Sequence, residues 1–399
     1  MIRKPLNILT NLRLAYLPVV AIAVIASAGC NTLKMGGARN ARQGDWLVDG
    51  ATNGRERHVN VRVQPPLERV WLYNANAGFG TGSPLLYRDA VIVGNRKGEL
   101  HAVEIETGRS LGVKNLGEAI EGSLLIRNGV LFATHAWGKY VLTAYDLNAG
   151  SMVWRVKGVP FETAPVAVDG SLVAIDVEGN IRSFNIDTGD SLWTTKLGAR
   201  VTVKASPLLL GGNRMFVVSD KGIGFMFDAT TGENIWYTDL EDPVYASPTA
   251  NGDQILVPTT RGRLHSISSS DASLLWTFDR RNETIRFASP ATDGSTVYVG
   301  TSSGNLFALD SSTGTVVWQF NGPDAITAAP LITDSHIYIG TMGRMLYGLD
   351  RKSGHLVWDI KLKGRIKSAM FAKEGELIVL TEPRYVYGFR EEAANEDSL

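Results

Sequence analysis

Residues 288 to 318 read ASPATDGSTVYVGTSSGNLFALDSSTGTVVW, and this stretch decides the fold. Three apolar runs follow its Ser289-Pro290 pair, and an Asp-Gly, a Ser-Gly or a Thr-Gly pair precedes each run. Because glycine adopts positive φ at no steric cost, such pairs suit the two-residue turns of antiparallel hairpins. The stretch predicts four short strands joined by tight turns. We expect Asp310 to bond its own backbone at the third turn and Trp318 to supply the largest apolar surface.

The same unit recurs along the chain at a spacing of about 40 residues, which is the signature of a repeat architecture. Three columns of equivalent positions show it. The proline column holds Pro84, Leu124, Pro165, Pro207, Pro248, Pro290, Pro330 and Met370. The tryptophan column holds Gly112, Trp154, Trp193, Trp236, Trp276, Trp318 and Trp358. The second-turn glycine column holds Gly98, Gly138, Gly179, Gly222, Gly262, Gly304 and Gly343. Together the columns define eight units.

The last unit ends after the apolar run 386 to 389 and has no fourth strand. A strand with the missing tryptophan, Trp71, stands before the first unit, so we expect it to complete the last sheet and close a ring. An open solenoid would need polar capping units at both ends instead. The sequence therefore predicts an all-β fold between residues 67 and 390, an eight-bladed β-propeller of four-stranded antiparallel blades.

Composition and motifs indicate no catalytic chemistry. The chain has 399 residues with 40 basic and 40 acidic side chains, a balance that favours no nucleic-acid partner. No phosphate loop, nucleophile elbow or kinase signature occurs. The histidines fall at unrelated positions of the units, so we predict no metal site. The acidic column that includes Asp310 is expected to cap turns. We therefore predict no catalytic residue and no cofactor.

Residues 1 to 29 have the order of a secretory signal, with basic residues, then an apolar run from 14 to 26, then small residues. The run is too short for a good membrane-spanning helix.

The four residues that end at Cys30, the only cysteine of the chain, resemble the lipobox of bacterial lipoproteins, although Ser27 stands where leucine is commoner. We expect a diacylated Cys30. The alternative is a buried or incidental cysteine behind an uncleaved anchor. Asn31 is not the aspartate that retains such proteins at the inner membrane in enteric bacteria, which favours the outer membrane.

Two segments lie outside the repeats. Residues 30 to 66 are rich in glycine, asparagine and arginine, and we expect a lipidated tether whose partial deletion is mild, with Trp46 docked on the ring. Residues 391 to 399 are a short acidic tail, for which we expect disorder.

The motif AxDxxTGxxxW, intact at 308 to 318, resembles the repeat of pyrroloquinoline-quinone dehydrogenases and of their non-enzymatic relatives, the BamB family of outer-membrane β-barrel assembly lipoproteins. The resemblance covers about residues 68 to 390. The enzymes of this group bind Ca²⁺ with the quinone and usually carry an adjacent cysteine pair, which a chain with one cysteine cannot form.

The resemblance thus implies a lipid-anchored scaffold at the periplasmic face of the outer membrane. Such a scaffold binds the β-barrel assembly machinery as a monomeric propeller within a complex and assists the insertion of outer-membrane proteins. Two alternatives stay open. One is another envelope-anchored propeller that acts as a binding or sensor module, and the other is a quinoprotein dehydrogenase.

Strand parity predicts where a partner binds. The loops after each second strand and the loops that lead to the next blade emerge on one face, which we call the loop face. There, residues 133 to 140 form a loop about three residues longer than its counterparts, and residues 279 to 287 are rich in arginine. Tryptophan and arginine are over-represented at binding hot spots. We expect partner contacts from Phe79, Trp137, Arg280, Arg281 and Arg286. Alternatively, Trp137 covers the neighbouring blade and the arginines are only solvated.

Overall fold

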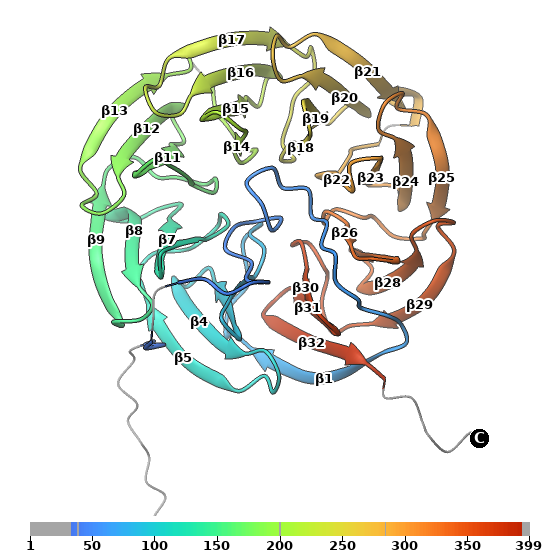
Figure 1. The fold of residues 1–399 in the computed structure, drawn as a ribbon, viewed down its shortest axis with the longest axis horizontal. Coiled ribbons are helices and arrows are strands. Elements are labelled where there is room, and N and C mark those ends of the chain that lie inside the picture. The colour runs from blue at the N-terminus through green and yellow to red at the C-terminus, as the bar shows by residue number, and fades with distance from the viewer. Residues whose placement is uncertain (1–32, 38–39, 199–200, 284, 393–399) are drawn as a thin grey trace, which may run out of the picture. The chain divides into compact units, whose positions relative to one another are not determined.

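The computed structural model describes residues 33 to 37, 40 to 198, 201 to 283 and 285 to 392. These residues form eight four-stranded antiparallel sheets around a central axis (Figure 1), so the predicted eight-bladed propeller is confirmed. The signal segment, Cys30 and residues 393 to 399 lie outside the described residues. Within the described ranges, no helix is long and apolar enough to cross a membrane.

The first four blades each pair four consecutive strands. Blade 1 contains β2 (Leu85–Tyr87), β3 (Ala90–Gly94), β4 (Glu99–Glu104) and β5 (Ser110–Asn115). Blade 2 contains β6 (Leu125–Arg127), β7 (Val130–Thr134), β8 (Tyr140–Asp146) and β9 (Ser151–Lys157). Blade 3 contains β10 (Val166–Val168), β11 (Ser171–Ile175), β12 (Asn180–Asn185) and β13 (Ser191–Lys196). Blade 4 contains β14 (Leu208–Leu209), β15 (Arg214–Val218), β16 (Ile223–Asp228) and β17 (Asn234–Asp239).

The last four blades continue the ring. Blade 5 contains β18 (Thr249–Asn251), β19 (Gln254–Pro258), β20 (Arg263–Ser268) and β21 (Leu274–Asp279), and the 3-10 helix η1 (Arg281–Glu283) follows it. Blade 6 contains β22 (Ala291–Thr292), β23 (Thr296–Gly300), β24 (Asn305–Asp310) and β25 (Val316–Asn321). Blade 7 contains β26 (Leu331–Ile332), β27 (His336–Gly340), β28 (Met345–Asp350) and β29 (Leu356–Lys361). Blade 8 contains β30 (Phe371–Lys373), β31 (Glu376–Thr381), β32 (Tyr385–Glu391) and β1 (Leu67–Asn74).

The ring closes where the sequence predicts. β1 pairs with β32 antiparallel, and Trp71 lies opposite Gly388. A Cβ on Gly388 would come 2.1 Å from Cε2 of Trp71, so this position has room only for glycine. The N-terminal strand therefore removes the open edge that the three C-terminal strands of blade 8 would otherwise present.

Each tryptophan of the tryptophan column packs its blade against the next one. The Trp276 indole of blade 5 donates from Nε1 to the Ser311 carbonyl in the third turn of blade 6, at 2.8 Å. Asp310 caps that turn as expected, because its Oδ1 accepts from the backbone N–H groups of Ser312 and Thr313. Gly314 completes the turn, and a Cβ there would lie 2.5 Å from the Trp276 ring. The repeat motif thus encodes a turn and the docking site for the preceding tryptophan.

The second turns differ from the two-residue turns that the sequence predicts. In blade 6, Ser302 to Gly304 form a three-residue loop in which Thr301 N–H donates to the Asn305 carbonyl and Gly304 has a φ of +95°. This is a type of loop in which the third residue adopts the left-handed region. In blade 7 that position belongs to Arg344, with a φ of 73°, and Gly343 stands one residue before it. The glycine column is therefore shifted by one position there.

Residues 33 to 66 are not a free tether. This segment, which we call the strap, runs across the ring on the face opposite the loop face (Figure 1). Its backbone bonds to the first strands of several blades: Trp46 pairs with Leu86, and Arg57 O accepts from Ile332 N–H at 2.9 Å. Trp46 is buried on the ring, as expected. Because the strap supplies backbone partners and buried side chains to the ring, we expect its partial deletion to be more damaging than the sequence indicates.

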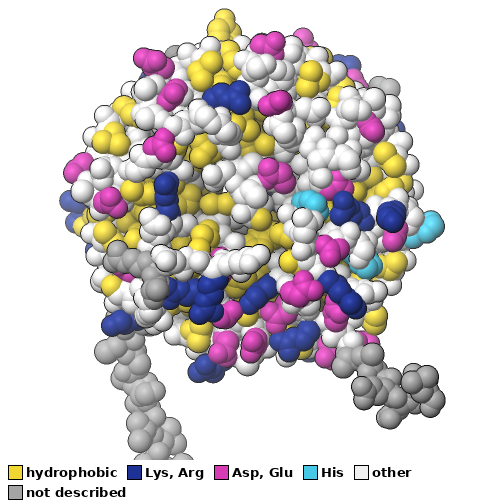
Figure 2. Space-filling model, viewed as in Figure 1, with side chains coloured by type: hydrophobic (Ala, Val, Ile, Leu, Met, Phe, Trp, Pro, Cys, Tyr) yellow, Lys and Arg dark blue, Asp and Glu magenta, His cyan; other side chains and the backbone are white. Residues whose placement is uncertain are grey.

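Charged side chains hold the strap at its two ends. Figure 2 shows the strap side, where Lys, Arg, Asp and Glu side chains gather over the blades that β1, β32, β4 and β5 mark in Figure 1. Arg42 of the strap and Lys373 of blade 8 both pair with Asp89 of blade 1. Arg62 pairs with Glu391 at 3.5 Å. These exposed pairs contribute little each, and the buried contacts carry most of the docking energy.

Leu33 replaces the tryptophan that blade 1 lacks. Leu33 is fully buried, and a Cβ on Gly112 would lie 3.1 Å from its Cα. Tyr145 of blade 2 donates its hydroxyl to the Leu33 carbonyl at 2.6 Å. The start of the strap thus occupies the position between blades 1 and 2 that an indole occupies elsewhere in the ring.

Candidate functional site

Trp137 is exposed on the loop face, as the sequence predicts. It lies between β7 and β8 and is 53% exposed. The segment between these strands runs from His135 to Lys139, one residue longer than Asn95 to Gly98 in blade 1. The expected excess of about three residues was therefore too large, and a single extra residue accompanies the exposed indole.

The arginines between blades 5 and 6 have three different environments. Arg280 pairs with Glu283, and its guanidinium lies 5.3 Å from the centroid of the Phe307 ring. Arg281 is exposed and pairs with Asp279 at 2.7 Å. Arg286 is exposed, and no described residue lies within ion-pair distance of it. Arg280 is thus held in the structure, whereas Arg281 and Arg286 can reach a partner. Trp137 is in blade 2, so the structure does not gather these residues into one patch.

Phe79 is not available to a partner. It is 2% exposed and belongs to the hydrophobic core around blades 8 and 1, together with Val93, Ile366 and Leu380. The loop from 75 to 84 folds inward because its phenyl ring fills the space between these blades. We therefore leave Phe79 out of the candidate surface.

A cavity of ≈ 420 Å³ lies at the centre of the loop face. The loops that lead from each blade to the next form its wall, and the strap supplies Asp49 and Arg57 to its lining. Four cationic side chains line it: Arg57, Lys204, Arg286 and Lys367. Only two acidic side chains line it, Asp49 and Glu162. The lining is therefore positive on balance.

A ladder of serine hydroxyls connects the blades around this cavity. Ser206 Oγ accepts from Ala164 N–H, Ser247 Oγ from Ser206 N–H, and Ser289 Oγ from Ser247 N–H, at 3.2, 3.1 and 2.9 Å. Each of these serines precedes a proline of the proline column. Each serine satisfies a backbone N–H donor of the preceding blade, which explains why serine recurs at this position of the repeat. All three serines line the cavity.

The strap brings two buried arginines to the ring's centre with one carboxylate between them. Arg55 and Arg57 are 4% and 3% exposed. Asp49 Oδ2 lies 3.5 Å from Arg55 Nε and 3.2 Å from Arg57 Nη2. Burial lowers the pKa of the Arg55 guanidinium to about 10; Asp49 opposes this shift and Arg57 adds to it. No described residue accepts a hydrogen bond from Arg57 Nε.

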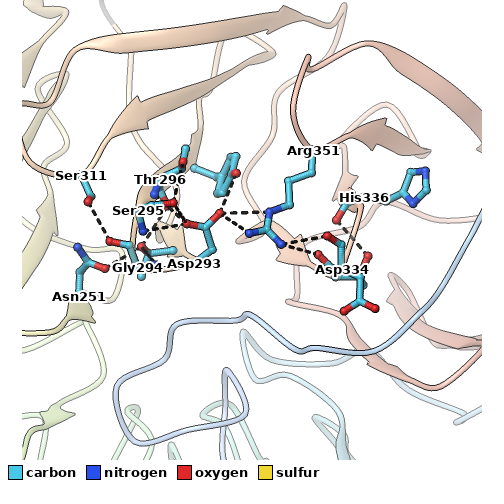
Figure 3. Close-up of polar contacts among 12 residues, drawn as sticks. Asn251, Asp293, Gly294, Ser295, Thr296, Ser311, Asp334, His336 and Arg351 are labelled. Carbon is cyan, nitrogen blue, oxygen red and sulfur yellow. Dashed lines mark hydrogen bonds and ion pairs between the residues drawn. The ribbon is translucent and has the colours of Figure 1, made fainter.

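On the strap side, a buried ion pair clamps blades 6 and 7. Figure 3 shows Arg351 reaching Asp293, with Arg351 Nη2 2.9 Å from Asp293 Oδ2. Burial by itself raises the pKa of Asp293. The hydrogen bonds from Ser295 and Thr296 and the charge of Arg351 outweigh burial and hold the pKa below its usual value. Because Arg351 also donates to the Asp334 carbonyl, we assign this cluster a structural role.

The histidines are dispersed in the structure. Among the described residues, no three His, Cys, Asp or Glu side chains are placed to hold a metal ion. Burial lowers the pKa of His101, His135 and His265, and that of His265 falls to about 4. His265 Nδ1 lies 2.9 Å from Thr277 Oγ1.

The free energy of unfolding is expected to fall as pH is lowered from 6.5 to 4. In this window the unfolded chain protonates His265 whereas the folded chain keeps it neutral, which costs up to about 1.4 kcal/mol per pH unit. Urea denaturation at pH 7.5 and pH 5 measures the difference. His265→Gln should flatten the dependence, and exposed His355→Gln should not. Equal slopes in the two variants would contradict this account.

A family model described as outer membrane protein assembly factor BamB matches residues 56–176, 177–323 and 320–396. The chain belongs to the BamB family. The matched segments include the end of the strap from residue 56 and all eight blades. The family resemblance that the repeat motif indicates is thereby confirmed.

Curated members of the BamB family match part of the chain. The outer membrane protein assembly factor BamB of Francisella salina is 29% identical over 204 residues, 49% of this chain and 37% of the relative. That of Legionella pneumophila (strain Paris) is 29% identical over 203 residues, 48% of this chain and 51% of the relative. The chain thus spans about half the length, or less, of these two relatives.

Solved structures share the fold. BamB from Moraxella catarrhalis has a TM-score of 0.68 and 16% identity over 81% of this chain and 99% of that chain. Quinohemoprotein alcohol dehydrogenase from Comamonas testosteroni has a TM-score of 0.74 and 13% identity over 88% and 82%. At such identities these structures show the propeller alone.

Sequence reasoning missed the strap and the central cavity. One signal was present: Val59, Val61 and Val63 alternate with polar residues, which is typical of an extended segment with one buried side. No comparable signal in the sequence of this BamB family member marks Arg57 or Tyr245. Both residues line the cavity, although they are far apart in the chain.

Proposed function

We propose that this chain is a non-enzymatic scaffold of the bacterial envelope. In this proposal, lipid on Cys30 anchors it to the periplasmic face of the outer membrane. Its loop face then binds the β-barrel assembly machinery and assists the insertion of outer-membrane proteins. The family match, which extends over all eight blades, is the observation that carries the proposal. The curated relatives are named outer membrane protein assembly factors, which supports the same role.

The proposed partner surface consists of Trp137, Arg281 and Arg286, with Arg280 supporting the loop. Trp137 presents a large rigid side chain at low entropic cost, and arginine can pair with carboxylates in two-point contacts. Since Trp137 belongs to blade 2 and the arginines follow blade 5, one partner has to extend across the cavity to contact both. A broad contact of this kind suits a stable complex between two rigid domains.

The double variant Trp137→Ala with Arg281→Glu is expected to abolish co-purification of the assembly machinery from detergent-solubilised membranes. It removes one apolar anchor and reverses one charge on the proposed surface. The matched control is Tyr237→Ala with Arg109→Glu, which changes an exposed aromatic residue and an exposed arginine outside the loop face. Full partner recovery with a folded double variant would show that the binding surface lies elsewhere.

Cys30→Ser is expected to release the protein from the membrane fraction or leave it unprocessed. Two or three acyl chains hold a protein far better than one, at about 0.8 kcal/mol per buried methylene. Incorporation of labelled palmitate measures the modification, and Asn31→Ala is the control that should keep it. Equal labelling of Cys30→Ser and the natural chain would rule out lipid attachment at this residue.

The proposal contains no catalytic step. The dehydrogenases that share the fold are 12 to 13% identical to this chain, and this level of likeness carries the architecture and not the chemistry. The assembly role instead needs a rigid ring with exposed loops, which the described blades provide.

A further inference from the structure

We propose that the central cavity of the loop face binds a carboxylate group, which pairs with Arg57 at the strap end of the cavity. This site lies beyond the proposed assembly function and does not depend on it. The ligand class is a carboxylate on a narrow group, either a small dicarboxylate or an acidic side chain of an extended peptide.

Arg57 has one buried hydrogen-bond donor without an acceptor. Its Nη2 pairs with Asp49, and its Nη1 donates to the Arg55 and Pro290 carbonyls. The partly buried Glu56 carboxylate adds a further negative charge nearby. No described residue accepts from Arg57 Nε, and a buried donor without an acceptor is costly. Because Arg57 lines the cavity, a carboxylate that enters from the loop face can supply the acceptor.

The cavity wall carries a cation without an ion-pair partner among the described residues. Lys204 is engaged by Glu162 at 2.6 Å, and Lys367 by Glu382 at 2.9 Å. Arg286 has no ion-pair partner among the described residues and stands at the same cavity. Asp49 and Glu162 are each paired with a cation, so the net charge of the lining is positive. A concave site with low-dielectric walls and a net charge concentrates ions of the opposite sign. The wall thus attracts an anion, and Arg57 pairs with it.

Three serine hydroxyls supply hydrogen-bond donors to the cavity. Ser206, Ser247 and Ser289 each use an oxygen lone pair to accept a backbone N–H of the neighbouring blade. Their hydroxyl protons are then left to donate, and all three serines line the cavity. A carboxylate accepts bonds only, through about four lone-pair sites, so donors from a cation and several hydroxyls match it.

The size of the cavity limits the ligand. A volume of ≈ 420 Å³ is within the usual range for small-ligand sites and admits one or two residues of an extended peptide. Because one of its principal cations comes from the strap, the site exists only when the strap is docked.

Calorimetric titration of the intact lipid-free chain tests the proposal. The probes are succinate and the peptide acetyl-Gly-Asp-Glu-Gly-amide, each compared with its neutral counterpart, succinamide or acetyl-Gly-Asn-Gln-Gly-amide. We expect one or both carboxylate probes to bind at least tenfold more tightly than the neutral counterpart, with an affinity that falls as salt is raised. If only succinate binds, the ligand of the cavity is a small-molecule anion. If the acidic peptide binds more tightly, the ligand is an acidic segment of a protein partner.

Variants decide whether the site is the one described. Arg57→Gln should weaken binding of the carboxylate probe at least tenfold, and Lys204→Ala with Arg286→Ala should weaken it several-fold. Lys221→Ala, an exposed cation on the same face outside the cavity lining, should leave it unchanged. The cavity-wall double variant changes exposed residues only, so it keeps the test valid should Arg57→Gln not fold. Equal binding of carboxylate and amide probes, or unchanged affinity in the folded cavity variants, would overturn the proposal. Neither result would affect the co-purification test of the assembly function.

Discussion

Replacing Asp49 by asparagine is expected to lower the free energy of unfolding by about 3 to 5 kcal/mol, the range seen when one partner of a buried ion pair is removed. Asp49 is the carboxylate that Arg55 and Arg57 share, and both guanidinium groups are nearly inaccessible to water. Without it, two like charges remain buried close together. Domains are stable by only about 5 to 15 kcal/mol, so the loss is a large share of the total.

Urea denaturation of the purified variants measures this effect. Asp187→Asn, the same change at an exposed position, should alter stability by less than about 0.5 kcal/mol. Adding Arg57→Gln to Asp49→Asn should restore part of the loss, because only one buried cation then remains, and residues in contact are not additive. If Asp49→Asn is as stable as Asp187→Asn, the strap cannot be docked as the structure has it.

Trp71→Ala is expected to cost about 3 to 5 kcal/mol, the typical loss for a buried tryptophan. Trp71 is 7% exposed and sits on Gly388 of β32. Its Nε1 donates to the Ile105 carbonyl of blade 1 at 2.7 Å. One side chain therefore links the closing strand, the C-terminal sheet and the first blade. Its loss leaves a cavity at the junction where the two ends of the propeller meet.

Thermal and urea unfolding of Trp71→Ala against Trp137→Ala provide a matched comparison. Trp137 is exposed, so its truncation should change the free energy of unfolding by no more than about 0.5 kcal/mol. Deletion of residues 31 to 72 removes the strand as well and should be more damaging than deletion of 31 to 60. Similar stability of the two tryptophan variants would show that ring closure does not depend on this strand.

Several features of the fold could be predicted because they depend on neighbours in the chain. Asp310 caps its turn through backbone groups two and three residues away, and Gly314 supplies the turn conformation. The number of times such a local pattern recurs gives the number of blades. The role of the strand at Trp71 follows from that number, because the last unit lacks a fourth strand and a closed ring needs one.

The candidate site was predicted less well, because exposure depends on what packs against a loop. Trp137 and Phe79 are both aromatic residues in loop-face segments, yet one is exposed and the other fills the space between blades 8 and 1. Sequence spacing does not distinguish these outcomes. The environments of the arginines could not be predicted either. Arg280 packs on the Phe307 ring, whereas Arg286 lines the cavity.

The sequence by itself determined the number of blades, the order of strands, the closing strand and the capping of the third turn by Asp310, since each is set by residues at most one repeat apart or by their count. Only the tertiary structure decided that the strap crosses the ring, that Leu33 stands in for a tryptophan, and that Arg55, Arg57 and Asp49 meet beside the cavity. The physical reason is that these contacts join the strap to blades far away in the sequence, as in the bond from Arg57 to the Pro290 carbonyl, 233 residues away. Contacts over such separations leave no periodic pattern in the chain.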